Sequence, residues 1–182
     1  EDEDQCDDNF DEWLNATGMV GSDGTGGKVT DPRTRRAYAG VAVLDPTGTR
    51  TAYLYCKVPG RQTVPRAELT ALIRVLRRMR AIRRWIIFID AQYVINGIAS
   101  PDRTFYLSGK NGDLWQEVFD GLKALHGKGI TEVNFVKVKS HVTSDDQWTR
   151  YNMTEEMYVY NELADAAALT ASDKYNVAAT NK

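Results

Sequence analysis

The stretch RRWIIFIDAQYVINGI, residues 83–98, constrains the fold of this chain more than any other part of the sequence. Residues 85–89 are five consecutive apolar side chains of β-branched and aromatic types, a pattern typical of a strand covered on both faces of a sheet. Asp90 follows directly, and a carboxylate there loses hydration unless another group compensates its charge. The stretch therefore predicts a buried strand and raises the question of what compensates Asp90.

The apolar pattern changes its period at Pro65. Before it, residues 19–22, 37–45 and 49–58 predict three strands in an antiparallel meander. After it, we expect helices at 65–79, 91–97, 113–125 and 154–170, and strands at 85–90 and 132–139. This order predicts an α/β fold with a five-stranded mixed sheet, in which three antiparallel strands are followed by parallel strands and helices flank the sheet.

Length and composition indicate a single core, since 182 residues with 42% hydrophobic and 26% charged residues are ordinary for one globular domain. We expect residues 1–17 to be a disordered acidic leader, residues 18–171 to form the domain and residues 172–182 to be a frayed polar tail. The absence of an initiator Met suggests a segment of a longer protein. The two cysteines, Cys6 and Cys56, suggest neither a disulfide framework nor a zinc site.

No apolar run approaches the roughly 20 residues of a membrane helix, and no signal peptide opens the chain. We therefore expect an intracellular protein without membrane contact, with nucleus and cytoplasm both open. The first 12 residues hold eight acids and no base, so the remaining 170 residues carry a net charge of +6 although the whole chain carries −2. A basic body suits a polyanionic ligand, and equally a mildly basic enzyme with a solvating tail.

Four acidic side chains fall at strand ends or on helices of this layout: Asp23, Glu68, Asp90 and Asp165. Asp23 ends the first strand and Asp90 the fourth, so both project from one sheet edge if these strands are parallel neighbours. Taken singly, Asp23 in a turn and Glu68 in a first helical turn have ordinary structural explanations. Only the joint order of the four acids indicates a site.

Carboxylates that converge raise one another's pKa, and divalent cations relieve this conflict. An all-oxygen ligand set selects hard ions, Mg²⁺ or Mn²⁺, over zinc. Two such ions about 4 Å apart can activate a water molecule and stabilise the leaving oxygen of a phosphodiester. We therefore hypothesise that Asp90 is compensated by metal and not by a basic side chain.

Several short pieces of the sequence together resemble the ribonuclease H family, in its type 1 and its retroviral or retrotransposon forms. The pieces are SDGTG (22–26), PRAELTAL (65–72), FIDAQYVINGI (88–98), GDLW (112–115), VKVKSH (136–141) and NELADAAA (161–168). The resemblance spans residues 18–171 and implies a ribonuclease H-like fold. It also implies that the four carboxylates bind two Mg²⁺ ions, which Mn²⁺ can replace, and that His141 assists proton transfer or product release.

The resemblance further implies contacts with nucleic acid. Arg61 and Thr63 match a pocket for a DNA phosphate, and Asn111 is its expected third member. Gln92 matches a glutamine that touches the minor groove of an RNA–DNA hybrid. The implied activity is endonucleolytic cleavage of the RNA strand of such a hybrid, leaving 5′-phosphates, in a domain of a retroelement reverse transcriptase or another multidomain protein. An attached or associated polymerase or other domain would then be a partner.

Three alternatives stay open: a catalytically inactive scaffold or hybrid-binding module, a nuclease of the same fold acting on DNA or structured RNA, and a binding module whose acids only cap turns. The sequence also departs from the family pattern. The basic substrate handle is absent or trimmed within residues 98–111, and KVTDPRTRR (28–36) replaces a glycine-rich segment. The insertion at 142–160 has three interpretations. It is a mobile lid that places His141, or it contacts a partner, or it displaces His141 from the chemistry. It also puts the assignment of Asp165 in doubt.

Six arginines form the densest basic cluster of the sequence: Arg74, Arg77, Arg78, Arg80, Arg83 and Arg84. They could contact a distal part of the hybrid, form a protein interface, or be a solvated face. Because 16 helical residues span roughly 24 Å, Arg84 is expected to lie far from Glu68.

Overall fold

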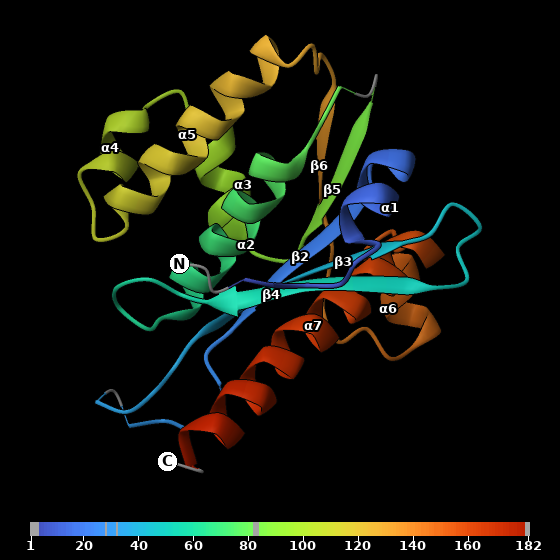
Figure 1. The fold of residues 1–182 in the computed structure, drawn as a ribbon. Coiled ribbons are helices and arrows are strands. Elements are labelled where there is room, and N and C mark those ends of the chain that lie inside the picture. Colours follow the sequence, from blue (N-terminus) through green and yellow to red (C-terminus); the bar gives the residue numbers. More distant parts are fainter. Residues whose placement is uncertain (1–3, 28, 32, 82–83, 181–182) are drawn as a thin grey trace.

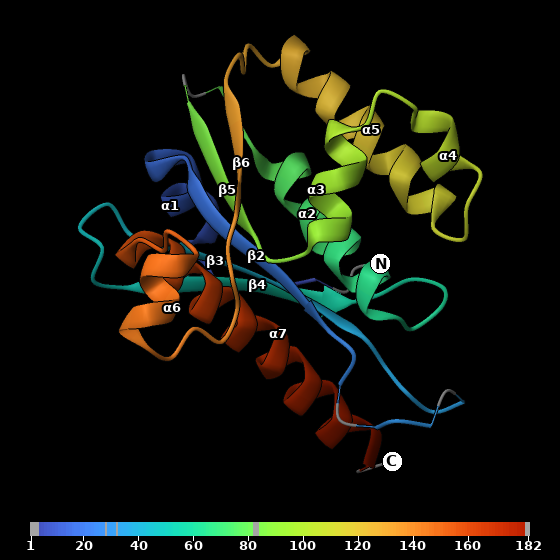
Figure 2. The same ribbon diagram turned by 180° about the vertical axis from the view of Figure 1, so that it is seen from behind.

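A six-stranded sheet forms the centre of the molecule, with helices on both of its faces (Figures 1 and 2). The computed structural model describes residues 4–27, 29–31, 33–81 and 84–180, with side chains up to residue 175. The strands are β1 (Gln5–Cys6), β2 (Met19–Thr25), β3 (Tyr38–Leu44), β4 (Thr51–Lys57), β5 (Trp85–Ile89) and β6 (Val133–Lys137). The helices are α1 (Phe10–Thr17), α2 (Val64–Arg78), α3 (Gln92–Ala99), α4 (Arg103–Leu107), α5 (Gly112–Gly127), α6 (Asp145–Arg150) and α7 (Glu155–Thr180).

The strand order is β1-β4-β3-β2-β5-β6. Strands β2, β3 and β4 form an antiparallel meander, and β5 and β6 run parallel to β2. The predicted mixed sheet flanked by helices is therefore confirmed, with six strands instead of five because β1 adds to the edge at β4. Among the described residues, no helix combines the length and apolar character needed to cross a bilayer.

The main core lies between the sheet and α2, with α1 and α5 closing its sides. Helix α2 begins as its sequence predicts: the Thr63 hydroxyl accepts a hydrogen bond from the Arg66 backbone N–H at 3.4 Å, and Pro65 occupies the first turn. Its apolar face buries Leu69 and Leu72 fully. This burial fixes the N-terminal half of α2 against the end of β2, and Glu68 lies there in the second turn instead of the expected first turn.

Helix α7 covers the opposite face of the sheet (Figure 1). Its alanines allow an unusually close approach, because a side chain at Gly40 of β3 would lie 2.2 Å from the backbone nitrogen of Ala168. A Cβ atom at Gly21 of β2 would likewise lie only 2.5 Å from the carbonyl oxygen of Tyr160. Small residues on both partners therefore bring Asp165, on α7, close to the sheet.

The prediction of a disordered leader is wrong for the described part of residues 1–17. Residues 5 and 6 pair with β4, and α1 buries Phe10, Leu14 and Trp13 in the main core. These three side chains recur at the i, i+3 and i+4 spacing of one helical face, which the surrounding acids obscure in the sequence. The N-terminal segment is therefore an integral part of the domain.

Two acids of this segment, Asp4 and Asp11, are neutralised by arginines of α2. Asp4 pairs with Arg74 at 3.0 Å, and Asp11 pairs with Arg78 at 2.9 Å. Further along the cluster, Arg77 pairs with Glu117, and Arg84 pairs with Glu132 at 3.0 Å. Arg83 lies outside the described residues. The cluster thus mainly binds acids of its own chain, which argues against a free nucleic-acid track along α2.

Three further segments are more ordered than the sequence predicts. The expected loop at 98–111 contains α4, the insertion contains α6, and α7 continues from residue 170 to residue 180, through most of the expected tail. The extension of α7 is held by Tyr175, whose ring stacks on Tyr38 with centroids 5.6 Å apart and lies under the ammonium of Lys57. An aromatic pair of this kind adds about 0.5–1.5 kcal/mol beyond burial.

Candidate active site

The parallel pairing of β2 and β5 brings two of the candidate acids together. Ser22 lies opposite Ile89 in the register, so the residues that follow them, Asp23 and Asp90, emerge at the same edge of the sheet. Glu68 reaches this edge from α2, and Asp165 reaches it from α7. All four acids line one cavity of about 280 Å³. The structure thus brings these four acids, which come from separate parts of the chain, together at the sheet edge.

Asp23 and Glu68 form the buried side of this cavity, each only 7% exposed. Burial and the nearby acids raise the pKa of Asp23 to about 7, even though its Oδ1 accepts a hydrogen bond from the Gly24 N–H at 2.8 Å. Burial first, and then the Asp23 charge and a hydrogen bond to Asp23, raise the pKa of Glu68 well above its usual range. The Glu68 Oε2 atom is buried without a hydrogen-bond partner. Within the part of the chain that the structure describes, neither Asp23 nor Glu68 forms an ion pair with a basic side chain.

The outer acids, Asp90 and Asp165, are only partly buried. The Asp90 Oδ1 atom lies 3.7 Å from the Nζ atom of Lys137, on the adjacent strand β6. The hypothesis that Asp90 has no basic partner is therefore wrong. The sequence could not reveal this pair, because it follows from the register that sets Ile89 opposite Lys137.

The residues of the cavity fit a hard divalent cation. Five carboxylates line the cavity, those of the four predicted acids and of Glu162, which the sequence analysis did not single out, and the buried Glu68 Oε2 atom is an oxygen without a partner that a cation would satisfy. Within the described ranges, no three Asp, Glu, His or Cys side chains are gathered into a complete ligand set. The acids therefore surround a common space instead of forming a closed cage, and binding an ion requires side-chain rotation, most simply of the partly exposed Asp90.

The raised pKa of Asp23 gives the metal-free domain a distinct pH dependence. Between the ordinary value of 3.8 and the folded value of about 7, the folded state holds more protons than the unfolded state. Stability therefore falls as the pH rises through this window, by on the order of 2–4 kcal/mol for this group. We expect urea denaturation in EDTA to show a loss from about pH 4 to about pH 7 that Asp23→Asn reduces. Equal slopes in the two proteins would contradict the burial of an uncompensated acid.

His141 lines the same cavity as the four acids. It follows β6 and adopts a left-handed backbone conformation, with φ of 56°, that turns the chain into the insertion. The insertion is a folded segment: Val142 and Met153 are buried, and the ring of Trp148 lies 5.3 Å from that of Tyr158 on α7. Of the three interpretations of the insertion, displacement of His141 from the site disagrees with this arrangement.

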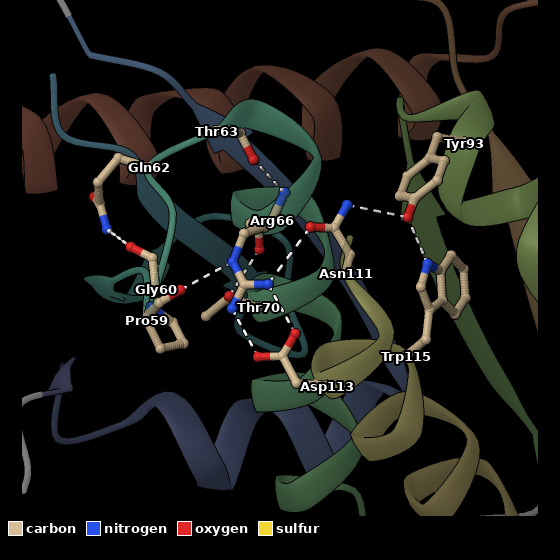
Figure 3. A network of polar contacts seen from close by, with 10 residues as sticks. All are labelled: Pro59, Gly60, Gln62, Thr63, Arg66, Thr70, Tyr93, Asn111, Asp113 and Trp115. Carbon is tan, nitrogen blue, oxygen red and sulfur yellow. Dashed lines mark hydrogen bonds and ion pairs between the residues drawn. The ribbon is translucent and has the colours of Figure 1, made fainter. Parts of the chain in front are cut away.

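A second polar network surrounds Arg66, which lies two residues before Glu68 on α2 (Figure 3). The guanidinium of Arg66 forms two hydrogen bonds of 2.8 Å with the Asp113 carboxylate, one of 3.0 Å with the Pro59 carbonyl and one of 3.5 Å with Asn111 Oδ1. This pairing lowers the pKa of Asp113 to about 2. Arg66 is almost fully buried, at 5% side-chain exposure. The bidentate geometry is one that arginine forms and lysine does not.

The Arg66 network positions two of the predicted substrate contacts. Thr63 caps the helix that carries Arg66, and the Asn111 amide nitrogen donates to the Tyr93 hydroxyl at 3.2 Å (Figure 3). Sequence reasoning gave Arg66 no role, although its place two residues before Glu68 in PRAEL was a signal. Arg61 is exposed on the loop before Thr63, and Gln92 is exposed on α3, where it donates to Asn96 at 2.8 Å.

A family model described as RNase H matches residues 22–173 of the chain. The chain therefore belongs to the ribonuclease H family. No curated protein matches the sequence.

Solved structures of ribonucleases H have the same fold at low sequence identity. LC9-RNase H1, a type 1 RNase H with the type 2 active-site motif, is 20% identical over 86% of this chain and 72% of its own, with a TM-score of 0.59. RNase H1 from the halophilic archaeon Halobacterium salinarum NRC-1 is also 20% identical, over 86% of this chain and 97% of its own, with a TM-score of 0.54. The foamy viral protease-reverse transcriptase in complex with an RNA/DNA hybrid is 14% identical over 84% of this chain and 20% of its own, with a TM-score of 0.51.

Proposed function

We propose that this domain is a metal-dependent endonuclease that hydrolyses the RNA strand of RNA–DNA hybrids. The observation that carries the proposal is the cavity at the ends of β2 and β5, which the four predicted carboxylates line and in which the Glu68 Oε2 atom has no hydrogen-bond partner. Membership of the ribonuclease H family supports the choice of reaction. The similar foamy viral structure contains an RNA/DNA hybrid, which supports the choice of substrate.

The acids have distinct tasks in this proposal. Asp23 and Glu68, held rigidly by β2 and α2, would form the buried half of a site for a pair of Mg²⁺ or Mn²⁺ ions, and Asp90 and Asp165 would form its exposed half. When bound, such ions supply an activated water and neutralise charge at the leaving oxygen of a phosphodiester. His141, at the solvent side of the cavity, is placed to move a proton at the scissile phosphate.

Substrate orientation would come from the surface beside the cavity. Arg61, Thr63 and Asn111 would hold a phosphate of the DNA strand, with Thr63 and Asn111 fixed by the Arg66 network. Gln92, exposed at the start of α3, would contact the minor groove. Choosing the RNA strand requires recognition of a 2′-hydroxyl near the scissile bond.

The proposed substrate class is tested by incubating the domain with labelled RNA–DNA hybrid, double-stranded RNA and double-stranded DNA, with Mg²⁺ and with EDTA. We expect cleavage of the hybrid alone, only with Mg²⁺, and 5′-phosphates on the RNA products. Cleavage of DNA or of double-stranded RNA at a similar rate would select a different nuclease of the same fold.

A catalytically inactive hybrid-binding module is the second candidate. The observation that favours it is the Lys137 ammonium beside Asp90, which places a positive charge where a metal ligand is proposed. Retained hybrid binding without cleavage at any Mg²⁺ concentration would select this candidate in the same assay.

The role of His141 is tested by His141→Ala. We expect a fall in kcat of roughly 10²-fold with little change in KM, because the histidine moves a proton and does not hold the substrate. Thr143→Ala, an exposed position two residues further on, is the matched control and should leave both constants unchanged. Full kcat in the His141→Ala variant would place this histidine outside the chemistry.

We also infer that affinity is shared with another domain, such as the polymerase of a retroelement reverse transcriptase. The connection between α3 and α5 carries only Arg103 and Lys110 as bases, and the guanidinium of Arg103 already lies 4.5 Å from the Phe119 ring centre. The isolated domain should therefore have a high KM that depends only weakly on salt, because few phosphate contacts release few counterions.

A further inference from the structure

Lys137 is a basic side chain that reaches the candidate metal site from outside it. It lies at the end of β6, directly opposite Ile89 of β5, and its Nζ atom is 3.7 Å from the Asp90 carboxylate. The same ammonium donates a hydrogen bond to the Val138 carbonyl at 2.8 Å. Both members of the ion pair are partly exposed, Lys137 at 35% and Asp90 at 28% of the side chain.

We propose that Lys137 competes with the divalent cation for Asp90 and thereby sets the metal concentration at which the site fills. This inference rests on the proposed function, because it takes Asp90 to be a metal ligand. The ammonium and a cation at Asp90 repel each other, so binding the cation must displace Lys137 or proceed against its charge. A flexible four-carbon stem and a second acceptor, the Val138 carbonyl, give Lys137 a place to remain when Asp90 turns away.

The geometry distinguishes Lys137 from the other bases near the cavity. Lys139 lies two residues further along the chain, but its ammonium is 5.3 Å from the Tyr151 ring centre, in a cation–π contact. Arg66 is engaged by the Asp113 carboxylate, the Pro59 carbonyl and Asn111 Oδ1. Lys139 therefore serves as a matched control: removing its charge changes the general electrostatics of this region but leaves the Asp90 pair intact.

The test is a calorimetric Mn²⁺ titration, with no nucleic acid, of wild type, Lys137→Met, Lys137→Arg and Lys139→Met, each first shown to be folded by its melting in EDTA. Because a unit charge near 4 Å contributes about 1 kcal/mol or more, we expect Lys137→Met to bind Mn²⁺ about three- to tenfold more tightly than wild type. Lys137→Arg, which keeps the charge, and Lys139→Met should stay within about twofold of wild type. The Mg²⁺ concentration for half-maximal cleavage should fall in Lys137→Met by the same factor.

Unchanged or weaker Mn²⁺ binding by Lys137→Met would overturn the inference while leaving the metal site in place. An equal gain in Lys139→Met would also overturn it, because the effect would then be general electrostatics. Absence of Mn²⁺ binding by all four proteins would overturn the proposed metal site itself, and the inference with it. Lys137→Gln, with a shorter polar side chain, repeats the charge removal if the Met variant is poorly folded.

Discussion

Replacing Glu68 by glutamine should abolish hybrid cleavage and at the same time stabilise the metal-free domain. Cleavage should fall by at least about a hundredfold, because a buried anionic ligand is lost where charge develops in the reaction. The free energy of unfolding in EDTA should rise by about 1–3 kcal/mol, because an uncompensated buried carboxylate is removed next to Asp23. Initial rates in Mg²⁺ and urea denaturation in EDTA measure the two effects.

Two further variants sharpen this test. Asp90→Asn should lose cleavage in the same way but keep, or even improve, hybrid binding, since Asp90 is the more exposed ligand. Glu117→Gln, a partly exposed acid that pairs with Arg77 away from the cavity, should keep the wild-type rate. Wild-type cleavage by either Glu68→Gln or Asp90→Asn would refute the assignment of these carboxylates to metal binding.

Replacing Phe10 by alanine should destabilise the domain by about 3–5 kcal/mol, the range for large-to-small changes at fully buried aromatic positions. Phe10 is completely buried, so the change opens a cavity in the main core and loosens α1 as a whole. Asp11→Asn is the matched control from the same helix. It removes only a half-exposed ion pair with Arg78 and should change stability by less than about 1 kcal/mol.

Urea denaturation of both variants at neutral pH measures these differences. A loss of less than about 0.5 kcal/mol for Phe10→Ala would mean that residues 4–17 do not pack on the core in solution. A loss for Asp11→Asn as large as that for Phe10→Ala would mean that charge, and not apolar burial, holds the segment.

Much of the sheet could be predicted from the sequence because its signals are local. The continuous apolar run at 85–89 has the composition of a covered strand, and Pro65 marks the start of the long helix. The position of Asp90 at a strand end follows from the same run. From these signals the sequence also predicts that Asp23 and Asp90 lie at one edge of the sheet. The register of β2 and β5 agrees, because it pairs the preceding residues, Ser22 and Ile89.

The N-terminal segment could not be predicted in the same way. Its eight acids in twelve residues have the composition of a solvated tail, and what orders it is the partner surface on α2, where Arg74 and Arg78 neutralise Asp4 and Asp11. Composition describes a segment alone, whereas these contacts join residues about 70 positions apart. The arginines of α2 allowed a nucleic-acid surface for the same reason: the sequence does not show which acids pair with them.

At the site, the acids could be predicted and their basic neighbours could not. Asp23 and Asp90 fall at strand ends and Glu68 near a helix start, where a single sequence identifies them, whereas Asp165 lies inside α7 and was predicted from the family resemblance. Lys137 and Arg66 acquire their roles only from tertiary placement: one from the register of β6 against β5, and the other from the approach of α5 to the start of α2. Lys137 was predicted only as part of a strand, and it is the residue that changes the interpretation of Asp90.

The most direct test of the central claim is a crystal structure of the domain grown or soaked with Mn²⁺, with anomalous scattering used to locate the ions. We expect manganese within about 2.0–2.3 Å of oxygens of Asp23, Glu68 and Asp90, with Asp165 beside it and the Lys137 ammonium turned away from Asp90. The crystals should be soaked at an Mn²⁺ concentration that saturates any binding seen in solution. If these carboxylates then shared no manganese ion, the proposed metal site would be contradicted.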